Sequence, residues 1–177
     1  MSTTKTPLGP IATPVLIGGA VAVGAAAIWY FFFSKQRIVL GFNRGKPSFL
    51  TVLKLSVPQQ NGDAAWLRAD AAQAFEDMRA AAARDGVTLA VSSAFRSVEA
   101  QAFLYAQNRL RACFSTTCQT ALPGYSNHQQ GTTLDVDTAN GTNAAYRWLV
   151  ANAKSYGFCR TVPHELHHWE FNGKCLA

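Results

Sequence analysis

The stretch that decides the fold of this chain is SNHQQGTTLD, residues 126–135. His128 and Asp135 lie seven residues apart within it. Gly131 stands between them and lets the backbone bend, so both side chains can face one metal ion. The same letters also fit an ordinary turn, because asparagine and aspartate favour loops. Two further segments, residues 92–97 and 165–171, help to distinguish these interpretations.

Residues 165–171 read ELHHWEF and hold a second pair of candidate groups. Glu165 and His168 share a face in a helical turn, whereas in a flat strand their side chains point to opposite sides. Pro163 just upstream favours the turn. One member of the pair then binds a metal while the other contacts water, and a solvated surface pair is the alternative. His167 is expected to support the site or to lie in the core.

Residues 92–97 read SSAFRS and place Arg96 directly after a predicted strand. A guanidinium there can bind a substrate carboxylate or a tetrahedral oxyanion. A surface salt bridge to Glu99 or Asp85 is the alternative. Together the three segments offer two imidazoles and one carboxylate as ligands, a spare carboxylate as base and a guanidinium. A hydrolytic zinc centre needs this inventory, with a fourth zinc position left open for water.

The motifs Ser-x-x-x-Arg-Ser, Ser-x-His-x-x-Gly-x-x-x-Asp and Glu-x-x-His-Trp, in this order, resemble those of the LAS metallopeptidases. Within these the chain looks like the VanY-type D-alanyl-D-alanine carboxypeptidases and related phage peptidoglycan endopeptidases, over roughly residues 64–173. The resemblance implies the LAS (hedgehog-like) fold, an α+β domain with a small antiparallel sheet flanked by helices. It also implies Zn²⁺ held by His128, Asp135 and His168, Glu165 as general base, Arg96 on the oxyanion, and substrate contacts from Gln101 and Ser126.

A zinc-dependent peptidase that hydrolyses peptidoglycan peptides follows from this resemblance. The sequence leaves open a D-Ala-D-Ala carboxypeptidase or a cross-link endopeptidase, including one used in phage lysis. No central group is missing, although the family often has tryptophan where this chain has His167. A non-catalytic, zinc-containing wall-binding protein or virion membrane protein is the alternative. Zinc used only for folding fits less well, because structural zinc sites are normally closed by four protein ligands.

The spacing of apolar residues predicts helices mixed with short strands. One helix is expected from Asp63 to about residue 84, a second from Ser97 as its cap to about residue 111, and a third over about residues 143–156. Because no βαβ repeat occurs, the fold class is α+β. Short strands are expected at residues 87–92, 158–162 and 168–171, and residues 48–57 are either a strand or part of a connecting arm.

The N-terminal part of the chain predicts a membrane anchor. No charged residue occurs between Lys5 and Lys35, and residues 15–33 read VLIGGAVAVGAAAIWYFFF. About 20 apolar residues are needed to cross a bilayer core, so this segment suffices for a single transmembrane helix. A cleaved signal peptide and a buried core helix are the alternatives.

Four parts of the chain are therefore expected. They are a polar tail at residues 1–10, a transmembrane anchor in the lipid bilayer at 11–34, a linker or arm at 35–62, and the zinc peptidase domain at 63–177. Small residues spaced four apart in the anchor would allow it to self-associate, namely Gly18, Ala22 and Ala26.

Charge and cysteines disagree about which side of the membrane holds the domain. The cations that follow the anchor favour the cytoplasm by the positive-inside tendency, namely Lys35, Arg37, Arg44 and Lys46. An even number of cysteines favours disulfides in an extracytoplasmic domain. The local pairs are Cys113 with Cys118 and Cys159 with Cys175, among three connectivities, with four free thiols as the alternative. We follow the cysteines and expect the domain in the periplasm, at the cell surface, or on a virion membrane, where the charge rule need not apply.

The formal net charge of +6 suits an anionic partner such as a cell wall or a lipid surface. No basic cluster interleaved with aromatic residues occurs in the sequence, so nucleic-acid binding is not expected.

Overall fold

The computed structural model of this protein describes residues 35–112 and 120–176. The predicted tail at 1–10, the predicted anchor at 11–34, and Cys113 and Cys118 lie outside these residues. From Lys35 onward the chain forms one compact unit. Across the part that the structure describes, no helix is long and apolar enough to span a membrane.

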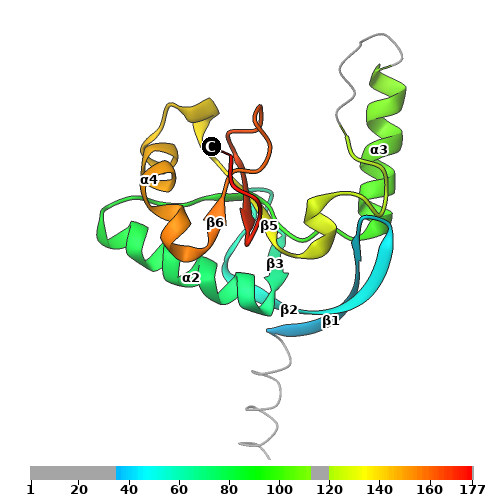
Figure 1. Ribbon diagram of the computed structural model, residues 1–177, viewed down its shortest axis with the longest axis horizontal. Coiled ribbons are helices and arrows are strands. Elements are labelled where there is room, and N and C mark those ends of the chain that lie inside the picture. Colours follow the sequence, from blue (N-terminus) through cyan, green and yellow to red (C-terminus); the bar gives the residue numbers. More distant parts are fainter. Residues whose placement is uncertain (1–34, 113–119, 177) are drawn as a thin grey trace, which may run out of the picture. The chain divides into compact units, whose positions relative to one another are not determined.

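A four-stranded antiparallel sheet carries the segments that were singled out in the sequence (Figure 1). Its strand order is β4-β5-β7-β6, so strands that are distant in sequence become neighbours. Leu134 and Val136 of β5 are fully buried and fix this strand against the core. The bounds are β4 (Val91–Ser93), β5 (Thr133–Val136), β6 (Phe158–Cys159) and β7 (His168–Phe171).

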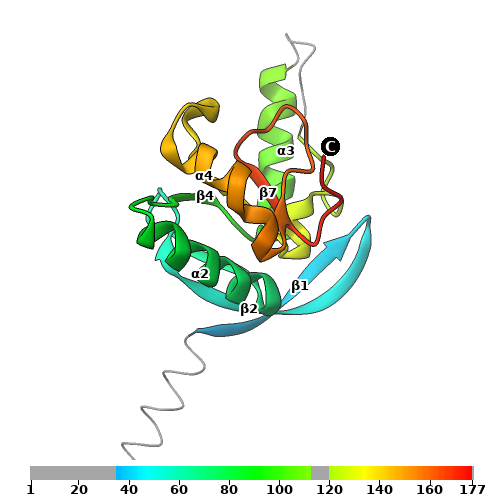
Figure 2. The same ribbon diagram turned by 60° about the vertical axis from the view of Figure 1, so that its left-hand side comes forward.

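A second, three-stranded antiparallel sheet is formed by β1 (Gln36–Asn43), β2 (Lys46–Pro58) and β3 (Ala64–Arg68). β1 and β2 form a long hairpin that extends away from the core (Figure 2). Its turn is Arg44-Gly45, and both residues have positive φ. Residues 35–62, expected to be a linker or arm, thus contain two strands. Most of their side chains are not buried, so these strands are stabilised mainly by backbone pairing with each other.

The start of the first predicted helix needs correction. The helix was expected from Asp63, but residues 64–68 form β3 and the helix begins at Ala69. In β3, Ala65 and Leu67 are fully buried while their neighbours are only partly buried, the period of two that characterises a strand. Pairing of β3 with β2 therefore overrides the helical spacing at this end.

Among residues 35–112 and 120–176, three α-helices and three short 3-10 helices accompany the sheets. Ser97 precedes the second α-helix, and its hydroxyl accepts a hydrogen bond from the backbone N–H of Ala100 at 3.2 Å, as expected of a cap. The α-helices are α2 (Ala69–Arg84), α3 (Val98–Ala112) and α4 (Ala144–Asn152), and the 3-10 helices are η1 (Asn127–Gln130), η2 (Ala139–Gly141) and η3 (Ala153–Tyr156). The predicted α+β class is confirmed.

One hydrophobic core joins both sheets to α2 and α4. Phe75 and Met78 of α2 are fully buried, and they share this core with Leu67, Leu134 and Phe158. Burying one such side chain stabilises the fold by roughly 1.5–3 kcal/mol. The core therefore provides a fixed support for the strands that carry the site.

A disulfide joins Cys159 of β6 to Cys175 in the C-terminal segment. This is one of the two local pairs considered from the sequence. The backbone N–H of Leu176 also donates a hydrogen bond to the carbonyl of Arg160 at 3.0 Å. The C-terminal segment is therefore fastened to the four-stranded sheet.

Candidate active site

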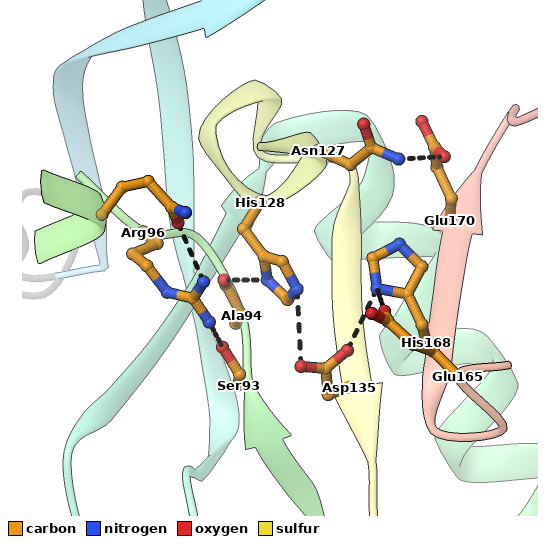
Figure 3. Close-up of polar contacts among 10 residues, drawn as sticks. Ser93, Ala94, Arg96, Asn127, His128, Asp135, Glu165, His168 and Glu170 are labelled. Carbon is orange, nitrogen blue, oxygen red and sulfur yellow. Dashed lines mark hydrogen bonds and ion pairs between the residues drawn. The ribbon is translucent and has the colours of Figure 1, made fainter. Parts of the chain in front are cut away.

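The four-stranded sheet and η1 bring the three predicted metal ligands together (Figure 3). Asp135 on β5 is paired in register with His168 on β7. His128 lies on η1, which ends at Gly131 in the left-handed conformation with a φ of 70°. Gly131 thus allows the bend that was predicted from the sequence, and it turns the chain from His128 into the strand that carries Asp135.

The Asp135 carboxylate lies between the two imidazoles. Its Oδ2 is 3.4 Å from Nε2 of His128, and its Oδ1 is 3.3 Å from Nδ1 of His168. The candidate ligand atoms of the three residues all lie within 4.8 Å of one another. All three side chains are largely buried, so the cluster is built into the fold rather than lying on the surface.

The ring of His128 is oriented by the backbone. Its Nδ1 lies 2.8 Å from the carbonyl oxygen of Ala94. A carbonyl only accepts, so Nδ1 carries a proton, and Nε2, which faces Asp135, is the ring nitrogen available to a metal ion. A hydrogen bond on the second ring nitrogen is how proteins commonly orient a metal-binding histidine.

The donor atoms fit a metal ion. Asp135 Oδ1 and both ring nitrogens of His168 are buried without a hydrogen-bond partner among the described residues. The contacts between Asp135 and the imidazoles are longer than the 2.7–2.9 Å or so of charge-assisted hydrogen bonds, and a cation bound by these atoms would satisfy them. Two imidazoles and one carboxylate, with room for a fourth ligand, form the ligand set of a catalytic zinc site.

The protonation state of Asp135 agrees with this role. Burial alone would raise the pKa of the Asp135 carboxyl, but the neighbouring imidazoles of His128 and His168 outweigh it and hold the pKa well below its usual range. The carboxylate is therefore ionised at neutral pH, which is the form that binds a metal.

Glu165 lies beside the cluster without belonging to it. Residues 165–168 form a turn in which the N–H of His168 donates to the carbonyl of Glu165 at 3.2 Å. This turn places Glu165 Oε2 3.3 Å from Nδ1 of His168, as the spacing of three residues predicted. The Glu165 side chain is one-third exposed, so a carboxylate at the edge of the cluster can exchange protons with solvent.

Arg96 is held by neutral groups. Its guanidinium donates to Oε1 of Gln101 at 3.0 Å and to Oγ of Ser93 at 2.9 Å. Among the described residues no carboxylate pairs with it, so the surface salt bridge considered as its alternative role is not formed. Burial lowers the pKa of Arg96, and the charges of Asp135 and Glu165 oppose this shift. The site therefore keeps an unneutralised cation close to the metal ligands.

The two residues expected to contact substrate are both buried in the wall of the site. Gln101 is 1% exposed and uses both ends of its amide, because its Nε2 donates to the Ala121 carbonyl at 2.7 Å while its Oε1 accepts from Arg96. This geometry makes Gln101 a support for Arg96. Ser126 is also buried, and it lines the same pocket.

The pocket around these groups has a volume of about 360 Å³. Arg96, His128, Asp135, Glu165 and His168 line it together. His167 was expected to support the site or to lie in the core; it is exposed and lines the pocket, so the core placement is wrong.

Two features of the pocket region were missed in the sequence. Tyr125, 57% exposed, lines the pocket from the loop before η1. Nδ2 of Asn127, another lining residue, donates to Oε2 of Glu170 at 3.1 Å. A signal for Glu170 was present, because it lies two residues after His168 and so shares a face of β7.

The part of the chain that carries these groups matches a known protein family. The family model for VanY, D-alanyl-D-alanine carboxypeptidase, matches residues 64–172. The chain belongs to the VanY family. The resemblance drawn from the three motifs is thus confirmed.

Two similar proteins are described by their action on, or their complex with, D-alanyl-D-alanine. A D-alanyl-D-alanine carboxypeptidase of Enterococcus faecalis (strain ATCC 700802 / V583) is 34% identical over 101 residues, which are 50% of this chain and 38% of the relative. The solved structure of VanYB in complex with D-alanine-D-alanine is 26% identical, with a TM-score of 0.59 over 76% of this chain and 86% of that chain.

Another solved structure is a zinc-bound mutant of the vancomycin resistance D,D-pentapeptidase VanY. It is 26% identical, with a TM-score of 0.53 over 66% of this chain and 78% of that chain. The chain spans about 40% of the length of the curated relatives it matches.

Proposed function

We propose that this chain is a zinc-dependent peptidase that removes the terminal D-alanine from peptidoglycan peptides ending in D-Ala-D-Ala. The observation that carries the proposal is the arrangement of His128, Asp135 and His168 around one point, with Glu165 and Arg96 in the same pocket. The zinc-bound and D-Ala-D-Ala-bound VanY structures support the choice of metal and of substrate.

His128, Asp135 and His168 would hold the zinc. When bound, zinc supplies a Lewis acid that polarises the scissile carbonyl and acidifies water. The three residues present one donor each, and the Ala94 carbonyl keeps His128 in the tautomer that exposes Nε2. The protein thus supplies a preorganised site.

Glu165 acts as the general base and then as the general acid in this proposal. Its carboxylate removes a proton from the attacking water and later delivers that proton to the leaving amine of D-alanine. The residue is suited to this exchange because one of its oxygens lies at the ligand cluster while its side chain is one-third exposed.

Arg96 stabilises negative charge that develops on the substrate. Among the described residues its guanidinium bonds only to Gln101 and Ser93, both neutral, so its charge is available to the oxyanion or to the terminal carboxylate. Arg96 is partly buried, and a partly buried cation without a carboxylate partner is costly in a protein that does not use it. This cost favours an anionic substrate group at Arg96.

A carboxypeptidase is favoured over an endopeptidase because of the relatives. VanYB binds D-alanine-D-alanine, and the Enterococcus faecalis relative is a D-alanyl-D-alanine carboxypeptidase. A non-catalytic wall-binding or virion membrane protein is the second candidate. The presence of Glu165 beside the cluster argues against it, because metal binding alone does not require that carboxylate.

We also propose an extracytoplasmic location, with residues 11–34 as the membrane anchor. The Cys159–Cys175 disulfide supports it, because disulfides persist mainly in oxidising compartments. The apolar run of residues 15–33 supports the anchor.

Mass spectrometry of the reaction products tests the activity. The full chain is incubated with a synthetic stem peptide ending in D-Ala-D-Ala, with chelator, and with zinc restored. We expect loss of one D-alanine, abolished by the chelator and recovered with zinc. In a parallel incubation with a cross-linked muropeptide, cleavage inside the cross-link would instead identify the chain as an endopeptidase. Stoichiometric zinc without any product would favour the non-catalytic candidate.

A further inference from the structure

A second, larger cleft adjoins the catalytic pocket. Its volume is about 1050 Å³, and Asn127 lines both cavities. The β1–β2 turn forms one part of its wall, and the C-terminal segment forms another. A substrate longer than the catalytic pocket can therefore pass Asn127 and enter this cleft, which we call the hairpin cleft.

Two walls of the hairpin cleft lie outside the part of the chain that matches the VanY family. That match covers residues 64–172, whereas the hairpin of β1 and β2 precedes it and Lys174, Cys175 and Leu176 follow it. The cleft is thus lined partly by segments that lie outside the residues matched by the family model.

Both of these walls are held in place. On the hairpin side, the backbone N–H of Gly45 donates to the Gly124 carbonyl at 2.8 Å, and a Cβ on Gly45 would lie only 2.8 Å from the hydroxyl oxygen of Tyr125. On the other side, the Cys159–Cys175 disulfide fastens the C-terminal segment. The hairpin turn is therefore docked on the same loop that lines the catalytic pocket.

The charge of the hairpin cleft is positive. Arg44, Lys46 and Lys174 line it, and none of them forms an ion pair or side-chain hydrogen bond with another described residue. The carboxylate that lines it is Glu170, which accepts a hydrogen bond from Asn127. Three cations facing one carboxylate attract an anionic group.

The other lining residues identify the kind of anion. Asn43, Ser48, Asn127, Gln130 and Thr161 offer hydrogen-bonding groups suited to a peptide backbone. No aromatic residue is among the described residues that line the cleft, so stacking of nucleic-acid bases has no platform there. An acidic peptide satisfies both the charge and the hydrogen-bonding groups.

We propose that the hairpin cleft binds a carboxylate-bearing part of the peptide substrate, on the N-terminal side of the bond that is cut. This inference rests on the proposed peptidase activity and adds a specificity determinant to it. Arg44 and Lys46 on the hairpin turn pair with the substrate carboxylate, while Asn127 lies where the peptide passes from one cavity to the other.

Kinetics on two matched peptides tests the proposal. Both end in D-Ala-D-Ala, and one has glutamate several residues upstream where the other has glutamine. The full chain is assayed in uncharged detergent micelles. For the wild-type protein we expect a lower KM with the glutamate peptide than with the glutamine peptide. The R44Q/K46Q variant should raise the KM for the glutamate peptide about 5-fold without changing kcat, because exposed ion pairs each contribute up to about 1 kcal/mol. The variant should leave the glutamine peptide unaffected.

Lys154→Gln is the matched control, because Lys154 is an exposed cation that does not line the cleft. It should leave both KM values unchanged. Equal KM values for the two peptides in the wild-type protein, or an R44Q/K46Q variant with unchanged KM for the glutamate peptide, would overturn the proposal.

Calorimetry separates this inference from the proposed activity. An acetylated peptide amide that keeps the glutamate but lacks the D-Ala-D-Ala end should bind the wild-type protein and bind R44Q/K46Q more weakly, whether or not any peptide is cleaved. Equal binding to both proteins would refute the cleft even if the peptidase is active. Polyphosphate serves as a competitor in the same measurement. If it displaces the peptide at a concentration lower than the peptide requires for binding, the cleft would be reassigned to anionic polymers.

Discussion

Gln101 joins Arg96 to the backbone of a neighbouring loop: its amide oxygen accepts from the guanidinium at 3.0 Å, and its amide nitrogen donates to the Ala121 carbonyl at 2.7 Å. Both ends of this amide already bond to protein groups and the side chain is 1% exposed, so Gln101 is better placed to hold Arg96 than to contact substrate. Its effect on catalysis should instead pass through the position of Arg96.

We therefore predict that Gln101→Met lowers kcat about 10-fold, or about 1.4 kcal/mol, while KM changes little. Arg96 would keep its bond to Ser93 but lose its second support, so the stabilisation of transition-state charge would weaken. Gln101→Glu should lower kcat further, because a carboxylate beside the guanidinium neutralises its charge. Steady-state kinetics on a D-Ala-D-Ala peptide measures both effects. Gln73→Met on the exposed face of α2 is the control, and an unchanged kcat in Gln101→Met would refute the positioning role.

Glu165→Gln separates metal binding from turnover. The amide keeps the shape of the side chain but cannot accept the proton of the attacking water, so we expect kcat to fall about 10²–10⁴-fold. Bound zinc, measured by elemental analysis of the purified protein, should stay at the wild-type stoichiometry. Glu99→Gln, which changes an exposed carboxylate of α3, should leave both quantities unchanged. Turnover at the wild-type rate in Glu165→Gln would exclude Glu165 as the base.

Removal of either imidazole should remove the metal. His128→Ala and His168→Ala each delete one of three ligands, and we expect zinc content to fall far below one ion per chain. His164→Ala is the matched control, because His164 is exposed and does not line the pocket. Zinc is measured after dialysis against a weak chelator. Wild-type zinc content in both ligand variants would contradict the ligand set.

Two parts of the candidate site were predictable from the sequence because their determinants are local, whereas the set of three ligands was expected from the family resemblance. The turn that joins Glu165 to His168 follows from a spacing of three residues, and the bend at Gly131 follows from the conformational freedom of glycine. The closeness of Asp135 to His168 is different. It depends on the register of β5 against β7, which links residues 33 positions apart and is set by packing of the whole sheet.

Of the β1–β2 hairpin, only β2 was considered from the sequence, as the strand alternative for residues 48–57, and the structure shows that strand. Two of the hairpin's large apolar side chains, Ile38 and Phe49, are 72% and 80% exposed, so their pattern does not mark a buried face. The strand at residues 64–68 was hidden for a related reason. Trp66 and Leu67 also fit the helical spacing that continues into α2, and only the partner strand β2 selects the extended form.

Glu76 connects this hairpin to α2, and it predicts a pH dependence of stability. Its Oε1 accepts from the N–H of Ser56 at 2.6 Å and its Oε2 from the Ser56 hydroxyl at 2.7 Å, while Arg79 donates to Oε2 at 3.0 Å. Burial alone would raise the pKa of Glu76, but the bonds from Ser56 and Arg79 outweigh it and lower the pKa below its ordinary value of 4.5.

A carboxyl group whose pKa is lowered in the folded state contributes stability that is present above the unfolded pKa and is lost as the pH falls through the folded pKa. We therefore expect Glu76→Gln to lower the free energy of unfolding by about 1 kcal/mol at pH 7. The difference from wild type should shrink as the pH falls below 4.5. Urea unfolding at a series of pH values measures it, with Asp77→Asn on the same helix as the control. A difference that stays constant down to pH 3 would show that the charge of Glu76 does not fasten β2 to α2.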